Sequence, residues 1–113
     1  MNDFERKHSQ LHDDLLTQGG RVVEMALQAC IAFFERDEAK AATVIEQDAV
    51  IDQVDVDIER ASIKLLLQQP GAEYDIRSVL TIVKINNELE RIADGAVAIA
   101  EHLPPEAVQP EII

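Results

Sequence analysis

Residues 45–59 read IEQDAVIDQVDVDIE, a run in which acidic and aliphatic side chains recur at steps of three and four. This period is that of an α-helix, so the run predicts a helix rather than a strand. At about 100° per residue, four of its acidic side chains fall within roughly 60° of one another. They are Asp48, Asp52, Asp55 and Glu59. The run therefore predicts a helix that carries a ridge of carboxylates.

Apolar residues flank this ridge on both sides. One strip comprises Val44, Ile51, Val54, Ile58, Ala61 and Leu65, and the other comprises Ile45, Ala49, Val56, Ile63 and Leu67. A helix that is apolar on two sides has to be covered on both. Three helices alone leave part of one strip uncovered, so we expect the chain to form a homodimer or a higher oligomer.

Two further helices are predicted on either side of this run. In the first, apolar residues recur at helical steps through Gly19-Gly20, a pair that invites a kink or close backbone packing. They are Phe4, Leu11, Leu15, Val22, Ala26, Ala29 and Phe33. In the last helix, the expected core seam is Ile82, Ile85, Leu89, Ile92, Ala96, Ile99 and Leu103. Cys30 is expected to be a small core residue.

Helix-ending signals divide the three segments. Asp37 is suited to cap the second helix, Pro70 to stop it, and Pro104 to stop the third. Short connections force neighbouring helices to be antiparallel. The sequence thus predicts an all-α fold, an elongated antiparallel three-helix bundle over residues 1–103, followed by a flexible C-terminal tail over residues 104–113.

The charge balance restricts the partners of the chain. Its 113 residues include 22 acidic and 10 basic ones, for a net charge of −12. This charge repels phosphate backbones and argues against nucleic-acid binding, whereas it suits metal cations or a basic protein surface. No signal peptide or membrane-inserting run is evident, so we expect a cytoplasmic protein.

The acidic ridge has two interpretations. Carboxylates four residues apart on one helix face can bind a cation, and a second pair, Glu90 and Asp94, lies at similar distance beyond Pro70. Ligation by oxygen alone suits Mg, Ca, Mn or ferric iron. The other interpretation is a solvated or salt-bridged ridge. His8 and His12 are four residues apart, but without a third ligand they are most simply surface residues.

Three stretches resemble the PhoU family of phosphate-signalling regulators: VIEQDAVIDQVDVDIE, QQPGAEYDIR and NNELERIAD, in this order and at compatible spacing. The resemblance covers roughly residues 4–103 and implies a three-helix bundle repeat. Typical members carry two tandem repeats, whereas this chain matches one. We therefore expect a second copy to stand in for the absent repeat.

The resemblance also implies a metal site built from two acidic pairs. These are Asp48 with Asp52, and Glu90 with Asp94, with Asp55, Glu59 and Asn87 as outer ligands or hydrogen-bonding groups. The metals that the family suggests are an iron cluster, Mg or Mn.

The implied function is that of a non-enzymatic regulator of phosphate uptake and phosphate signalling. Its expected partners are the ATPase of a phosphate ABC transporter and a sensor histidine kinase. Two alternatives remain, a metal-storage or metal-sensing bundle unrelated to phosphate and a purely structural helical adaptor. No nucleophile–base pair or phosphate-binding loop is evident in the sequence, so an enzyme is not expected.

Overall fold

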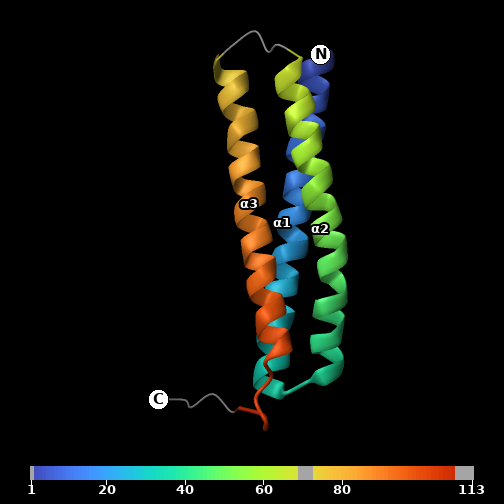
Figure 1. Ribbon diagram of the computed structural model, residues 1–113, viewed down its shortest axis with the longest axis vertical. Coiled ribbons are helices and arrows are strands. Elements are labelled where there is room, and N and C mark those ends of the chain that lie inside the picture. Colours follow the sequence, from blue (N-terminus) through green and yellow to red (C-terminus); the bar gives the residue numbers. More distant parts are fainter. Residues whose placement is uncertain (1, 69–72, 109–113) are drawn as a thin grey trace.

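Three long helices form an elongated bundle in the computed structural model, which describes residues 2–68 and 73–108, apart from the side chain of Tyr74. The helices are α1 (Asp3–Glu35), α2 (Glu38–Leu67) and α3 (Glu73–Glu101), and the molecule measures 57 × 31 × 19 Å. Figure 1 shows that α2 runs antiparallel to the other two helices, and that α1 and α3 run in the same direction. The predicted all-α three-helix fold is confirmed.

Local capping explains where α1 begins and ends and where α2 begins. The side chain of Asn2 accepts a hydrogen bond from the Glu5 backbone N–H at 2.7 Å, which caps α1. Arg36 ends α1 in the left-handed conformation, with φ 53°. The carboxylate of Asp37 then accepts from the Lys40 N–H at 3.0 Å, so the predicted cap of α2 is confirmed. The predicted stop at Pro70 lies outside the described residues.

The core runs along the inner faces of all three helices in two clusters. Their buried members include Val22, Met25, Ala29, Val44, Ala93 and Ala96 in one, and Leu11, Leu15, Ile58, Leu65, Val79 and Ile82 in the other. A buried polar contact links α1 to α2, since the Gln18 side-chain amide donates to the Ile51 carbonyl at 2.9 Å. Within the described residues, none of these helices is both long enough and apolar enough to cross a membrane.

The expected core seam of α3 is wrong in part. Ile85 and Ile92 are exposed, whereas Asn86, Ala93 and Ala100 are buried. Relative to the expected seam, α3 is rotated about its axis so that its alanines face both α1 and α2. This orientation is favoured because small side chains let three helices approach closely. Two isoleucines are thereby left on the edge of the bundle.

The other expectations for the helices have mixed outcomes. Cys30 is exposed, so its expected core position is wrong. The glycine pair does not interrupt α1, and it packs against no other backbone, since a Cβ at Gly19 meets only the Leu89 side chain at 4.0 Å and a Cβ at Gly20 meets nothing within 4 Å. On α2 the strip that begins at Ile45 is exposed, while most of the strip that begins at Val44 faces the core. Three helices therefore leave one strip of α2 uncovered, as predicted.

Candidate metal centre

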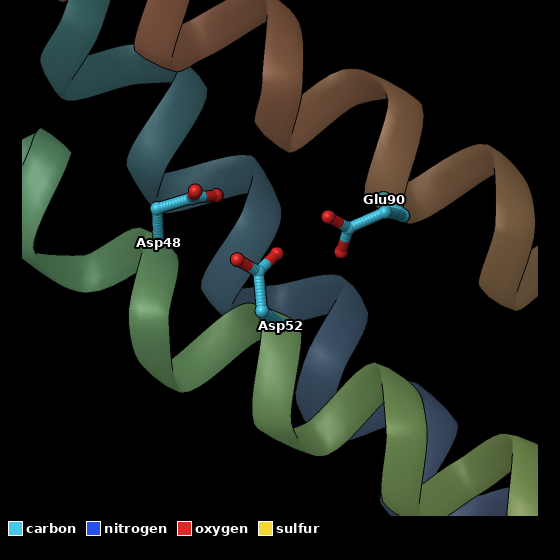
Figure 2. Close-up of side chains that lie close together, drawn as sticks. All are labelled: Asp48, Asp52 and Glu90. Carbon is cyan, nitrogen blue, oxygen red and sulfur yellow. The ribbon is translucent and has the colours of Figure 1, made fainter.

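Three carboxylates meet between α2 and α3 near the middle of the bundle. Asp48 and Asp52 lie one turn apart on α2, and Glu90 approaches them from α3. One oxygen of each lies within 4.8 Å of the other two. Figure 2 shows Glu90 pointing across the gap toward Asp52, with Asp48 beside it on the same helix face. The α-helical period positions the α2 pair, and packing of α3 against α2 brings in the third group.

The cluster is partly shielded from solvent, and no basic side chain in the described part of the chain forms an ion pair with it. Asp48 Oδ1 and Glu90 Oε2 are buried, and neither has a hydrogen-bond partner among the described residues. The ion pairs found in residues 2–68 and 73–108 include none of the three carboxylates. Buried acceptors without partners are unfavourable, and more so when they carry charge.

The electrostatics of the site reflect this crowding. Burial, together with the adjacent Asp52 carboxylate, raises the pKa of Glu90 to about 8. Burial also raises the pKa of Asp48, with a further contribution from repulsion by Asp52 and Asp94. Both shifts have the direction expected when desolvation and like charges disfavour the ionised form. A proton or a cation at this site would relieve the repulsion among the three groups.

Asn86 is a polar residue of this region that sequence reasoning missed. It is buried, and its Nδ2 donates to the Asp55 carboxylate at 2.6 Å and to the Asp55 carbonyl at 3.2 Å. Its own Oδ1 is buried without a partner among the described residues. Burial and repulsion from Glu59 raise the pKa of Asp55, while the bond from Asn86 lowers it. The signal in the sequence is that Asn86 lies at helical steps from Ile82, Ala93 and Ala100, as the amide on a helix face that these residues make apolar.

The remaining predicted site residues lie around this cluster. Asp94 is exposed and is not one of the three grouped carboxylates, although its charge acts on Asp48 and Glu90. Glu59 and Asn87 are exposed, and Asp55 is half-buried and bonded to Asn86. The structure thus brings together three of the four predicted inner ligands. The complete ligand set stays a prediction.

The donor set suits a hard cation. Each of the three grouped residues offers carboxylate oxygens, which Mg, Ca, Mn and ferric iron prefer over the nitrogen and sulfur ligands typical of zinc and copper. The two buried oxygens without partners supply acceptors that a cation satisfies. The residues present therefore fit a metal ion.

The two histidines of α1 are engaged separately. His8 Nε2 lies 2.7 Å from Ser78 Oγ, and its ring stacks on Phe4. His12 is exposed, with Nδ1 3.3 Å from the Asp13 carboxylate. The two rings thus have different partners.

Comparison with known proteins gives a family match over most of the chain. A family model described as the PhoU domain matches residues 15–103, a range that contains the three carboxylates and Asn86. No solved structure matches the chain.

Several curated proteins are similar to the same part of the chain. The phosphate-specific transport system accessory protein PhoU homolog of Clostridium acetobutylicum is 36% identical over 99 residues, which are 87% of this chain and 45% of that protein. The PhoU homolog of Streptococcus pneumoniae is 34% identical over 88% of this chain and 46% of its own length. PhoU of Escherichia coli is 30% identical over 82% of this chain and 39% of its own length. The chain spans less than half the length of these relatives.

Proposed function

Because the chain belongs to the PhoU family, we propose that it is a non-enzymatic accessory protein that regulates phosphate-specific transport and phosphate signalling. The observation that carries this proposal is the family match over residues 15–103. The relatives named above are accessory proteins of phosphate-specific transport systems. Regulation through protein contacts, rather than catalysis, agrees with a bundle whose distinctive groups are carboxylates on helix faces.

A cation bound by Asp48, Asp52 and Glu90 is the second part of the proposal. When bound, it supplies the positive charge that these three groups lack, and it links α2 to α3 at mid-height. Asp94 completes the inner ligands, and Asp55, Glu59 and Asn87 serve as outer ligands or hydrogen-bonding groups. The bound metal is Mg, Mn or an iron cluster. The buried oxygens without partners support this part of the proposal.

The proposed partners are the ATPase of a phosphate ABC transporter and a sensor histidine kinase, both met in the cytoplasm. The acidic face between α2 and α3 suits a basic protein surface, since the chain carries a net charge of −12. Opposite charges on two surfaces accelerate and orient their association. A regulator that restrains phosphate uptake through protein contacts needs no catalytic activity.

Phosphate uptake and partner capture test the proposed function together. Deletion of the gene should raise the rate of radiolabelled phosphate uptake at high external phosphate, and tagged protein should co-purify with a phosphate-transport ATPase or a histidine kinase. Unchanged uptake together with failure to capture either partner would refute the regulatory role.

A metal-storage or metal-sensing bundle is the alternative that the carboxylate cluster favours. In that case deletion changes the cellular content of the bound metal, or the response to it, and leaves phosphate uptake as it was. Measuring metal content and phosphate uptake in the same deletion strain separates the two functions.

A further inference from the structure

An exposed apolar patch lies where the C-terminal half of α2 meets the first turns of α3. It consists of Val56, Ile63 and Leu67 on α2 and of Ile76 and Leu80 on α3, and each has between 37% and 76% of its surface exposed. Figure 1 shows that the end of α2 and the beginning of α3 lie at the end of the bundle that holds the N-terminus. We call these five residues the α2–α3 patch. Large apolar side chains grouped on the surface of a small protein mark an interaction site.

The register between the two helices places the patch residues at matching heights. Asn86 donates a hydrogen bond to Asp55, which fixes one pair of facing positions. From this pair, Ile63 lies eight residues further along α2, and Leu80 lies six residues back along α3. At about 1.5 Å per residue, the heights of these two side chains agree to within about 3 Å. One turn further, the last α2 member and the first α3 member of the patch match in the same way.

The patch lies on the same side of the bundle as the three grouped carboxylates. Ile63 follows Asp52 by eleven residues, which corresponds to a rotation of about 20° on the helical wheel. Ile76 precedes Glu90 by fourteen residues, which corresponds to about 40°. The patch and the carboxylates therefore form one continuous surface, which is apolar toward the N-terminal end of the bundle and acidic at its middle. We call it the α2–α3 surface.

The charges along this surface differ between its two parts. Glu59 extends the carboxylate ridge toward the patch, and neither it nor the three grouped carboxylates belongs to an ion pair within residues 2–68 and 73–108. Basic residues border the patch itself, since Arg60 lies one turn from Ile63, and Lys84 lies one turn from Leu80. A ligand is therefore expected to place apolar groups on the patch and positive charges on the carboxylates.

We propose that the α2–α3 surface binds an amphipathic helix of a partner protein, whose contacting face is apolar in one half and carries Lys or Arg in the other. Asp48 and Leu67 are nineteen residues apart, or about 28 Å, so a partner helix of about twenty residues covers the surface. Such a helix presents its anchors at steps of three and four residues. The inference rests on the proposed function only in requiring a protein partner, and it adds the chemistry by which that partner is recognised.

A second copy of this chain does not supply such a helix. The helices α1, α2 and α3 carry six, seven and six acidic residues, against three basic residues each. Each of them would bring more negative than positive charge to the carboxylates, and like charges across an interface oppose binding. Charge complementarity therefore requires a different protein, one with a basic segment.

A labelled synthetic peptide tests the chemistry of the α2–α3 surface on the full chain. The peptide has about twenty residues, with leucine at steps of three and four in one half, lysine at the same steps in the other half, and alanine and glutamine elsewhere. Fluorescence anisotropy in the presence of a chelator should show saturable binding at micromolar protein. The same peptide with glutamate in place of lysine should bind at least about tenfold more weakly, and added salt should weaken binding of the lysine peptide.

Two matched pairs of variants locate the binding on the molecule. Ile63→Asp should raise the Kd of the lysine peptide about tenfold or more. Val50→Asp should leave it nearly unchanged, because Val50 is an equally exposed residue of α2 that lines a hollow with α1 instead. Glu59→Gln should raise the Kd several-fold, whereas Glu46→Gln should not. Circular dichroism checks that all four variants are helical. Absence of saturable binding, equal binding of the glutamate peptide, or equal effects within either pair of variants would overturn the proposal.

Photocrosslinking in cells identifies the natural segment. Benzoylphenylalanine in place of Ile63 should crosslink to another protein, whereas in place of Val50 it should not, and the sequence of the crosslinked segment should be apolar in one half and basic in the other. No crosslink at Ile63, a crosslink to a second copy of this chain, or a segment without basic residues would overturn the proposal. A segment with the expected pattern in a protein outside phosphate transport and phosphate signalling would support the surface and count against the proposed function.

Discussion

Replacement of Glu90 by Gln distinguishes a metal centre from a merely acidic surface. At a metal centre, the substitution should stabilise the metal-free protein and make the metal-treated protein less stable than wild type. The substitution keeps the shape of the side chain and replaces an ionisable carboxyl, one of three that lie within 4.8 Å of one another, by a neutral amide. The new amide can donate to Asp52. Without metal we therefore expect Glu90→Gln to be more stable than wild type.

The size of this gain follows from the pKa of Glu90, which is raised from 4.5 to about 8. Each unit is worth about 1.4 kcal/mol, so the full shift sets an upper limit of roughly 5 kcal/mol. Glu90 is only half-buried, and solvent screening reduces the expected gain to on the order of 1–2 kcal/mol. For a domain of this size, that is a rise in Tm of about 5–10 °C.

With a suitable metal, the order of stability reverses. A ligand present at one hundred times its Kd stabilises the native state by about 2.7 kcal/mol, which exceeds the gain from charge removal. Wild type should therefore melt higher than Glu90→Gln when manganese, magnesium or iron is added, and lower after treatment with a chelator. Differential scanning calorimetry under both conditions measures the crossing.

A matched control isolates the cluster from the general charge of the protein. Glu46 is an exposed glutamate of α2 that is not a member of the carboxylate group. Glu46→Gln removes the same charge and should follow wild type in both conditions. If Glu90→Gln is no more stable than wild type after chelation, and both respond equally to every metal, the reasoning about the site is wrong.

Three further predictions concern stability. In metal-free wild type, the native state keeps the Glu90 proton between pH 4.5 and about 8, whereas the unfolded chain has lost it. The Tm of wild type should therefore fall as pH rises through this window, and Glu90→Gln should flatten the fall. Asn86→Ala should lower stability by about 1–3 kcal/mol in urea unfolding, because the half-buried Asp55 carboxylate loses its donor; Asn87→Ala, at an exposed neighbour, should change it little. Gly20→Ala should raise stability by up to about 1 kcal/mol, since the added Cβ meets nothing in an uninterrupted helix, and a loss would contradict the open surroundings of this position.

The sequence by itself determined the local features of this protein. Steps of three and four residues predicted three helices, and the Asp37 side chain predicted where α2 begins. The same period placed Asp48 and Asp52 on one helix face. Similar distances from Pro70 predicted that Glu90 lies opposite them, and these three carboxylates do meet. Such features depend on backbone geometry within a helix and on chain length between helices, and both can be read from a single chain.

Only the tertiary structure decided how each helix is rotated about its axis. Both possible seams of α3 are apolar, so the pattern alone could not distinguish the face with Ile85 and Ile92 from the face with Ala93 and Ala100. Simultaneous packing against two neighbours selected the alanine face. That rotation buried Asn86 beside Asp55 and left the isoleucines on the surface. The orientation of α1 likewise left Cys30 exposed. Periodicity fixes which residues share a face, whereas the direction of that face depends on the space between three helices.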